Sequence, residues 1–333
     1  MPERLTLDAA HALVSRILVR CNTSPENAAL VANALVGAEL TGQSGHGLRR
    51  LPSYAAQAAS GKVDGHAVPV AEQTKPGVLR VDAAHGFAYP ALALAIEALP
   101  EMARAQGIAA AVVRRSHHAG VTGLFVEELA RHGLVAMMLA NTPAAIAPWG
   151  GARALFGTNP IAFAAPVRGA EPLVIDLSVS KVARGNIMAA GQKGEPIPEG
   201  WALDAGGQPT TDPAAALRGT MVPMAGAKGA ALALMVEVLA AGVTGANYAS
   251  EASSFFTAGG PAPGTGQFLM ALDPEAMGGA AALERIGQLA AAIEGEPDAR
   301  LPGRRRQALR ARIAAEAIAL DAGLAAEIDA LGR

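Results

Sequence analysis

The stretch GHGLRR, residues 45–50, places a histidine and an arginine four positions apart between two Ala/Leu-rich segments. A guanidinium can hold a carboxylate through two hydrogen bonds, and a neighbouring imidazole can give or take a proton near neutral pH. His46 and Arg50 together therefore suit reduction at the carbon next to a carboxylate. A histidine taken alone is more often structural than catalytic, so this interpretation depends on the polar groups elsewhere in the chain.

A second cluster, RRSHHAGVTG at residues 114–123, ends an expected strand and turns through two glycines into an expected helix. The free amides at such a helix start can hold a phosphate. His117 and His118 at this turn are rival candidates for a proton donor. The alternative is an ordinary capped helix with two surface histidines.

Two further stretches lie at the ends of apolar segments. LFGTNPIAF (155–163) carries Thr158 in a turn, and VIDLSVSKVARGNI (174–187) follows a buried strand with Asp176, Ser178 and Ser180. Strand ends are where α/β proteins tend to expose ligand-binding groups. A plain turn and a solvated loop are the respective alternatives.

Basic residues occur at two more places where an anion could bind. Lys228 lies at a glycine-framed helix start in PMAGAKGAALALM (223–235), and RLPGRRR (300–306) has four arginines around a Pro-Gly turn. The first is either an anion cradle or an ordinary helix start. The second is either a phosphate clamp or solvated surface charge. No G-x-G-x-x-G follows a strand, so a dinucleotide would have to be bound in another way.

Alternating strand and helix patterns between residues 77 and 272 predict an α/β core. Strands are expected at 77–83, 108–116, 134–141, 161–166 and 172–178, and helices at 91–107, 120–133 and 227–243. Helical patterns flank this core at 5–40, 51–61, 281–295 and 304–331, and an extended linker is expected at 69–76. We therefore expect a helical domain built from both chain ends (1–75 plus 280–333) and an α/β domain at 76–279.

The composition indicates a compact globular protein without nucleic-acid or membrane partners. The 333 residues are 51% hydrophobic and 17% charged, and the formal net charge of −2 is too small to gather nucleic acid or an anionic membrane. The single cysteine, Cys21, excludes an internal disulfide and a multi-cysteine zinc site. We therefore expect no metal and a cytoplasmic location.

Taken together and in order, these clusters resemble the type-2 malate/L-lactate dehydrogenase family. The similarity extends over nearly the whole chain, through HGLRRLPSYAAQAASGKVDG, SHHAG, GTNPIAFAAP, EPIPEGWALDAGGQPTTDP and GAKGAALALMVEVLAAGVTGA. VDAAHGFAYPALA and RLPGRRR are most similar to the branch with Δ1-piperideine-2-carboxylate/Δ1-pyrroline-2-carboxylate reductases and sulfolactate dehydrogenases. The resemblance implies a nicotinamide-binding α/β domain that is not a Rossmann fold, a helical domain and a homodimer.

The resemblance also implies a role for each residue. His46 would be the proton donor, and Arg50 would anchor the substrate carboxylate. The substrate pocket would be lined by Thr158, Val179 and Ser180. The dinucleotide would be held by His118, Ala119, Gly120, Val121, Thr122, Asp176, Leu177, Ser178, Ala227, Lys228, Arg300, Arg304, Arg305 and Arg306. NADPH is expected, with NADH as the alternative, since a 2′-phosphate matches a guanidinium fork.

The implied activity is hydride transfer to C2 of a small 2-imino or 2-oxo carboxylate, such as Δ1-piperideine-2-carboxylate or Δ1-pyrroline-2-carboxylate. The alternatives are a 2-hydroxyacid dehydrogenase acting on sulfolactate, malate or lactate, and a nucleotide-binding protein that has lost catalysis. Three differences from the family pattern bear on this choice. Gly45 stands where the reductases have a serine, Asn186 stands where they have a relay aspartate, and Val179 stands where a threonine is usual. Without an acidic partner, His46 is expected to be oriented by a hydroxyl, an amide or water.

Overall fold

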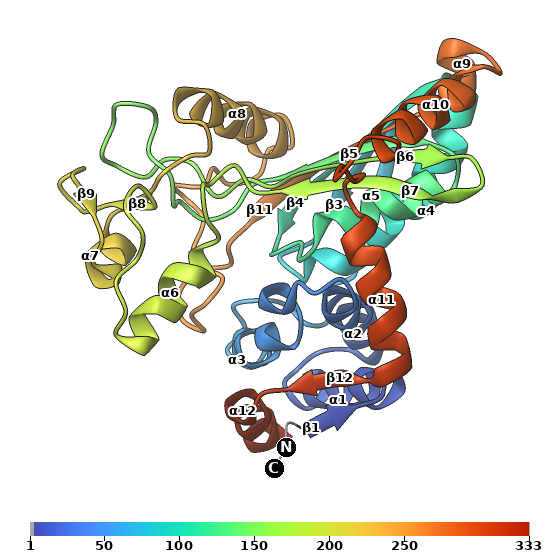
Figure 1. Cartoon of the computed structure of the whole chain (residues 1–333). Coiled ribbons are helices and arrows are strands. Elements are labelled where there is room, and N and C mark those ends of the chain that lie inside the picture. Colours follow the sequence, from blue (N-terminus) through green and yellow to red (C-terminus); the bar gives the residue numbers. More distant parts are fainter. Residues whose placement is uncertain (1–2, 333) are drawn as a thin grey trace.

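A mixed seven-stranded sheet forms the centre of the protein (Figure 1). The structure is a computed structural model and describes residues 3–332. Its strands are β2 (Val70–Lys75), β3 (Val78–Asp82), β4 (Ile108–Ser116), β5 (Val135–Ala140), β6 (Ile161–Val167), β7 (Ala170–Leu177) and β11 (Thr265–Leu272). The order is β2-β3-β4-β11-β5-β6-β7, and only the β3–β4 pair is parallel. This topology differs from the parallel sheet of a Rossmann fold, as expected.

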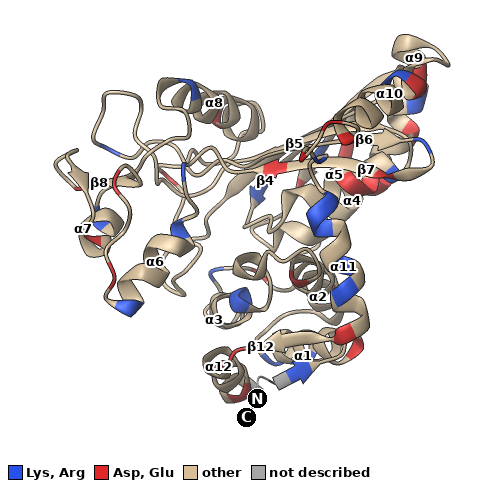
Figure 2. Ribbon diagram, viewed as in Figure 1, with Lys and Arg blue, Asp and Glu red and all other residues tan. Residues whose placement is uncertain are grey.

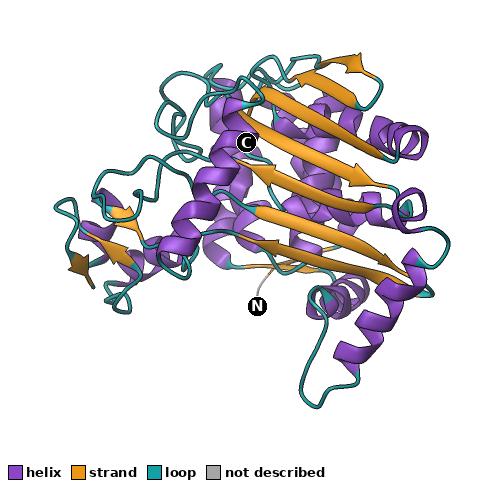
Figure 3. Cartoon of the chain, turned by 90° about the horizontal axis from the view of Figure 1, so that it is seen from above, coloured by secondary structure: helices purple, strands orange, loops and turns teal. Residues whose placement is uncertain are grey.

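Helices α4 (Ala88–Gln106) and α5 (Thr122–Arg131) cover one face of the sheet. The strands alternate buried and half-exposed side chains, as their period of two requires. The buried set meets Leu92, Leu99 and Leu129 of the two helices. Figure 3 shows the opposite face, where the strands lie in front of these helices.

Helices from both ends of the chain form a second layer below the sheet in Figure 1. They are α1 (Leu7–Arg20), α2 (Pro25–Leu40), α3 (Leu51–Ala59), α11 (Arg304–Glu316) and α12 (Ala322–Gly332). The hydroxyls of Thr6 and Ser24 cap α1 and α2. Strand β1 (Glu3–Leu5) pairs antiparallel with β12 (Ile318–Leu320), so the two chain ends lie side by side.

A third group of short elements extends from the sheet at the left of Figure 1. It comprises α6 (Arg184–Lys193), β8 (Ala202–Leu203), β9 (Pro209–Thr210), α7 (Pro213–Arg218), β10 (Thr220–Met221) and α8 (Ala227–Glu237), which continues as a π-helical turn at Val238–Gly242. Its own core contains Ile146, Ile187, Ile197 and Met221. The remaining helices, α9 (Pro274–Gly278) and α10 (Ala282–Glu294), precede α11, and α10 packs on β6.

Two expectations from the sequence are wrong. The linker expected at 69–76 is the exposed edge strand β2, whose side chains lack the alternation of a half-buried strand. The helix expected at 304–331 is interrupted, because Ala317 has a φ of +78° and the next residues pair with β1 as strand β12. The second layer is therefore closed by a strand pair as well as by helix packing.

Neither a field of charge nor a metal centre marks the site. Positive and negative side chains are interspersed over the elements (Figure 2). Among the described residues, no helix is both long and apolar enough to cross a bilayer, and no group of three or more His, Cys, Asp or Glu could hold a metal ion. The site is therefore defined by burial and hydrogen bonding.

Candidate active site

The turn of residues 44–50 is held in place by the Glu39 carboxylate. After α2 the chain makes two short 3-10 turns, Ser44–His46 and Leu48–Arg50. Glu39 Oε1 accepts a hydrogen bond from the Leu48 amide (2.8 Å), and a β-carbon at Gly47 would collide with the same carboxylate. Burial raises the pKa of Glu39. Glycine at position 47 therefore lets the turn approach Glu39 closely, which fixes the start of α3.

The Arg50 guanidinium lies at the inner end of this turn with one donor unsatisfied. Its Nε donates to the Gly45 carbonyl oxygen (2.9 Å), and its Cζ lies 4.4 Å from the centre of the Phe256 ring. Its Nη1 is buried and has no hydrogen-bond partner among the described residues. An unpartnered N–H of a buried cation favours an anion. The position therefore suits a carboxylate of a ligand.

His46 begins a chain of hydrogen bonds that runs into the protein. His46 Nδ1 lies 3.1 Å from His118 Nε2, and His118 Nδ1 lies 2.5 Å from Tyr54 Oη. Tyr54 Oη lies 3.0 Å from Tyr89 Oη. The partner of His46 is thus an imidazole, instead of the expected hydroxyl, amide or water, because the turn after β4 brings His118 directly against the His46 ring.

His117 faces away from His46. Its Nε2 lies 2.7 Å from Gln57 Oε1, and Gln57 Nε2 donates to the Phe255 carbonyl oxygen (2.8 Å). The Phe255 ring lies 5.1 Å and 5.2 Å from the His117 and His118 rings. His118 is engaged at both ring nitrogens, whereas His117 is engaged at Nε2 and has a buried, unpartnered Nδ1 among the described residues. His46, whose Nε2 has no partner in the part of the chain that the structure describes, is the histidine available to a ligand.

All three imidazoles are held neutral by burial and by Arg50. Burial lowers the pKa of His46 to about 4 and that of His117 to about 3, and it lowers the pKa of His118 well below its usual value. The charge of Arg50 lowers all three pKa values further. Burial raises the pKa of Tyr54 to about 12, so its hydroxyl keeps its proton. Neutral donors and acceptors therefore surround the Arg50 charge.

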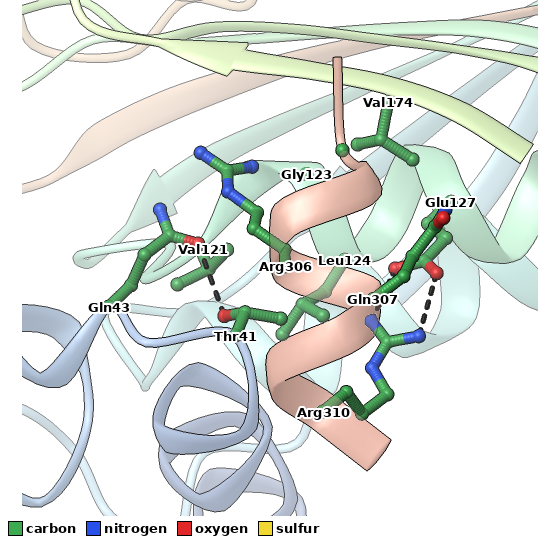
Figure 4. Close-up of a pocket in the computed structure, with 11 residues that line it drawn as sticks. Thr41, Gln43, Val121, Gly123, Leu124, Glu127, Val174, Arg306, Gln307 and Arg310 are labelled. Atoms are coloured by element: carbon green, nitrogen blue, oxygen red, sulfur yellow. Dashed lines mark hydrogen bonds and ion pairs between the residues drawn. The ribbon is translucent and has the colours of Figure 1, made fainter. Parts of the chain in front are cut away.

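Asp176 joins three elements at the end of β7. Its Oδ1 accepts from the Thr122 hydroxyl (3.0 Å) at the start of α5, and its Oδ2 accepts from Gln43 Nε2 (3.3 Å), beside the 44–50 turn. Arg306, in the first turn of α11, donates to the Asp176 carbonyl oxygen (3.0 Å) and lies 3.4 Å from Oδ2. Gln43 and Arg306 line the cleft in Figure 4. The structure thus brings three predicted cofactor segments to the His46 turn.

Two helix starts at this junction fit the phosphate groups of a dinucleotide. No side chain caps α5 or α11. Gly120, before α5, has a φ of +66°, and a β-carbon there would lie 2.7 Å from the Tyr89 hydroxyl. Gly303, before α11, has a φ of +94°, and a β-carbon there would lie 3.2 Å from the Val174 carbonyl oxygen. Free amides at helix starts favour anions, and Ala119 and Val121 lie on the same path into α5.

The predicted substrate residues Thr158 and Val179 contact each other, but no described hydrogen bond joins them to His46 or Arg50. The Thr158 hydroxyl lies 3.3 Å from Thr142 Oγ1, and the Val179 amide donates to the Thr158 carbonyl oxygen (2.9 Å). The Val179 side chain is fully buried in the core of the third group. Val179 therefore positions Thr158 through its backbone.

The chain after β7 leads to the start of α8. Leu177 is exposed, and the hydroxyls of Ser178 and Ser180 lie 3.0 Å apart. Residue 180 then bridges to Pro223, just before α8. Ala227 and Lys228 are exposed in the first turn of α8, which no side chain caps. This third helix start is joined, through the bridge between residue 180 and Pro223, to the chain that follows Asp176.

The four predicted arginines are not equivalent. Arg306 contacts Asp176, whereas Arg304 Nε donates to Glu294 Oε1 (2.7 Å). Arg300 and Arg305 are exposed. Arg305 and Arg306, in the first turn of α11, are therefore the pair best placed for a phosphate.

Several residues that complete the site are not identified by the sequence analysis. They are Gln43, Tyr54, Gln57, Tyr89, Phe255 and Phe256. The sequence spacing could have identified Tyr54, because it follows Arg50 by four positions and so shares a helical face with it. Gly45 and Asn186, two of the positions at which this chain differs from the reductases, take no part in the hydrogen bonds of His46. A β-carbon at Gly45 would meet no atom within 4 Å, and Asn186 is exposed in the first turn of α6.

The arrangement could hold an anionic substrate next to a histidine with a free ring nitrogen, and a phosphate-bearing cofactor at the uncapped helix starts. The family model described as malate/L-lactate dehydrogenase matches residues 5–329, and the chain belongs to this family.

Relatives and solved structures agree with this assignment. The chain is 52% identical over 310 residues to the (2R)-3-sulfolactate dehydrogenase (NADP(+)) of Chromohalobacter salexigens, covering 93% of this chain and 92% of that protein. It is 42% identical over 309 residues to a Δ1-pyrroline-2-carboxylate/Δ1-piperideine-2-carboxylate reductase of Pseudomonas syringae pv. tomato, covering 92% and 90%. The crystal structure of Δ1-piperideine-2-carboxylate reductase from that organism has a TM-score of 0.93 at 40% identity, with 99% of each chain covered.

Acid should destabilise the fold through the buried histidines. His117 is 1% exposed with a pKa of about 3, whereas the unfolded chain binds its proton below about pH 6.5. Between these values the unfolded state binds more protons, so the free energy of unfolding falls as the pH drops, by about 2 kcal/mol at pH 5 for this residue. Urea unfolding at pH 7 and pH 5 should show a loss about 2 kcal/mol smaller in His117→Gln. Equal losses in both proteins would contradict the prediction.

Proposed function

We propose that this protein uses NADPH to reduce C2 of a small 2-oxo or 2-imino carboxylate. The observation that carries the proposal is the unpartnered Nη1 of Arg50, whose charge acts on His46, a histidine with one ring nitrogen that has no partner among the described residues. Arg50 holds the substrate carboxylate, and His46 donates to the oxygen or nitrogen bonded to C2. NADPH, when bound, supplies the hydride.

The residues around Asp176 would hold the cofactor. The α5 start at Ala119–Thr122 suits the dinucleotide phosphates, and Arg305 and Arg306 suit the 2′-phosphate at the α11 start. Asp176 keeps these two helix starts together through Thr122 and Arg306.

Two substrate classes fit the same pair of residues. The relative at 52% identity favours the oxo acid of (2R)-3-sulfolactate, which is sulfopyruvate. The relative at 42% identity favours the cyclic ketimines Δ1-pyrroline-2-carboxylate and Δ1-piperideine-2-carboxylate. Both classes carry a carboxylate on the carbon that receives the hydride, so Arg50 would hold either carboxylate in the same way.

NADPH oxidation with sulfopyruvate, pyruvate, oxaloacetate and the two ketimines tests the proposal. Turnover should occur with at least one of them. His46→Ala should lower kcat by about 10²–10⁴, because it removes the donor. Arg50→Lys should mainly raise the KM for the substrate, because it loses the fork but keeps the charge. No turnover by the wild type would favour a nucleotide-binding protein without catalysis, and full turnover by His46→Ala would exclude His46 as the donor.

The cofactor preference should depend on Arg306 more than on Arg304. Arg306→Ala should raise the KM for NADPH about tenfold or more and the KM for NADH less, because NADPH loses the charged hydrogen bonds to its 2′-phosphate while both cofactors lose the effect of the Arg306–Asp176 contact. Arg304→Ala is the matched control, since the Arg304 side chain is already engaged by Glu294. Equal kcat/KM for NADPH and NADH in the wild type, or equal effects of the two variants, would contradict this assignment.

We further propose that the protein is a homodimer that forms through the face of the sheet opposite α4 and α5, where the α8 region and α10 leave it uncovered. Val112, Phe163 and Met270 are half-buried on neighbouring strands of this face, beside Met137 and Phe268, which pack on Val236 and Leu239 of the α8 region. Such a contiguous apolar surface favours a partner, and a second copy offers the same surface.

Light scattering should give a mass of twice the 33.5 kDa chain. Met270→Lys should shift the protein toward the monomer, because a charge would be buried in the interface. Val19→Lys is the control, as Val19 is 42% exposed on α1 in the other layer. A monomeric wild type, or dissociation by Val19→Lys alone, would contradict the proposal.

A further inference from the structure

We propose that Tyr89, Tyr54 and His118 fix His46 as the tautomer with its proton on Nε2, so that it is a donor without carrying a charge. The inference rests on the proposed function, in which His46 Nε2 faces the substrate. The three residues act through His46 and are therefore positioning residues.

The direction of the hydrogen bonds is set at the inner end of the chain. Tyr89 is 3% exposed, and its hydroxyl has a single partner among the described residues, Tyr54 Oη at 3.0 Å. A buried hydroxyl proton without an acceptor is costly, so Tyr89 donates and Tyr54 accepts. Tyr54 then directs its own proton to its other partner, His118 Nδ1, at 2.5 Å.

His118 passes this direction to His46. A neutral imidazole has one N–H, and His118 Nδ1 already accepts from Tyr54, so the proton of His118 is on Nε2. That Nε2 donates to His46 Nδ1 at 3.1 Å. His46 accepts at Nδ1 and therefore carries its own proton on Nε2, the nitrogen that has no partner in the described protein.

These proton positions require both imidazole rings to be neutral, and the charges around them keep the rings neutral. Arg50 faces His46 and His118, and Lys62 acts on the neighbouring His117. Asp176 is the one negative group that raises the His46 pKa, and burial together with Arg50 outweighs it. The imidazoles therefore remain uncharged near neutral pH.

The tautomer explains how His46 works without an acidic relay. A carboxylate partner would accept a proton from Nδ1, whereas His118 donates one to Nδ1. With Gly45 and Asn186 at the relay positions, no side chain competes for that nitrogen. A neutral Nε2–H in a buried site stabilises negative charge that develops on a substrate oxygen.

The first test needs no substrate and reads the tautomer in the wild type. ¹⁵N spectra of histidine-labelled wild type at pH 7, with His46 assigned through His46→Asn, report which nitrogen carries the proton. We expect a protonated Nε2 and a bare Nδ1. A protonated Nδ1 would overturn the inference, whatever the substrate assays show.

The second test compares a tyrosine of the hydrogen-bond chain with a tyrosine outside it. Tyr54→Phe removes the donor to His118 Nδ1, so His46 should show mixed tautomers and kcat should fall about tenfold with little change in the substrate KM. Tyr248→Phe is the control, because Tyr248 is 46% exposed and lies outside the hydrogen bonds that run from Tyr89 to His46, so the tautomer and kcat should stay near those of the wild type. Equal effects on the spectra would overturn the inference. Absence of turnover in the wild type would instead contradict the proposed function and leave the spectra to decide the tautomer.

Discussion

One positive charge, on Arg50, governs the chemistry around it. A guanidinium stays ionised when buried, so its neighbours must adapt to it. The three adjacent imidazoles are neutral, the Phe256 ring lies against the cation, and the Gly45 carbonyl satisfies Nε. The nearby Asp176 is itself engaged by Arg306. The Arg50 charge is therefore left for the carboxylate of a ligand.

The site depends on both layers of the fold. Arg50 and His46 come from the helical layer, whereas His118 and Asp176 come from strand ends of the sheet. Helix α11 returns from the far end of the chain and is tied to α5 by two hydrogen bonds from Arg310 to Glu127, at 2.8 Å and 2.7 Å. That tie places Arg306 beside Asp176. Neither layer holds a complete site without the other.

Local sequence patterns were sufficient to predict the helices and strands whose apolar residues recur with a clear period. Strand β4 begins and ends where alternating residues predict it, and Ser24 with Pro25 marks the start of α2. Strand β11 is not predicted, because it follows a Gly/Pro-rich stretch and pairs with β4 and β5, which are far away in the sequence. Strands β1 and β12 are too short for a pattern, and only their pairing makes them strands.

The same distinction applies to the site. Residue type and local spacing make His46, Arg50 and the helix starts candidates, and the family resemblance gives them their expected roles. Phe255 and Tyr89 enter through contacts over long sequence separations, and no local signal marks them. A lone sequence can show which groups could do chemistry, but the proton direction of His46 follows only from the partners that burial gives it.

That proton direction bears on the choice between the two proposed substrate classes. A carbonyl oxygen has lone pairs that accept the Nε2–H of a neutral His46, and it gains negative charge as hydride reaches C2. A ketimine nitrogen accepts that hydrogen bond only while it is unprotonated, and its protonated form would add a positive charge next to Arg50. The buried guanidinium and the fixed tautomer therefore favour a 2-oxo carboxylate, because its developing negative charge is the one that both residues stabilise.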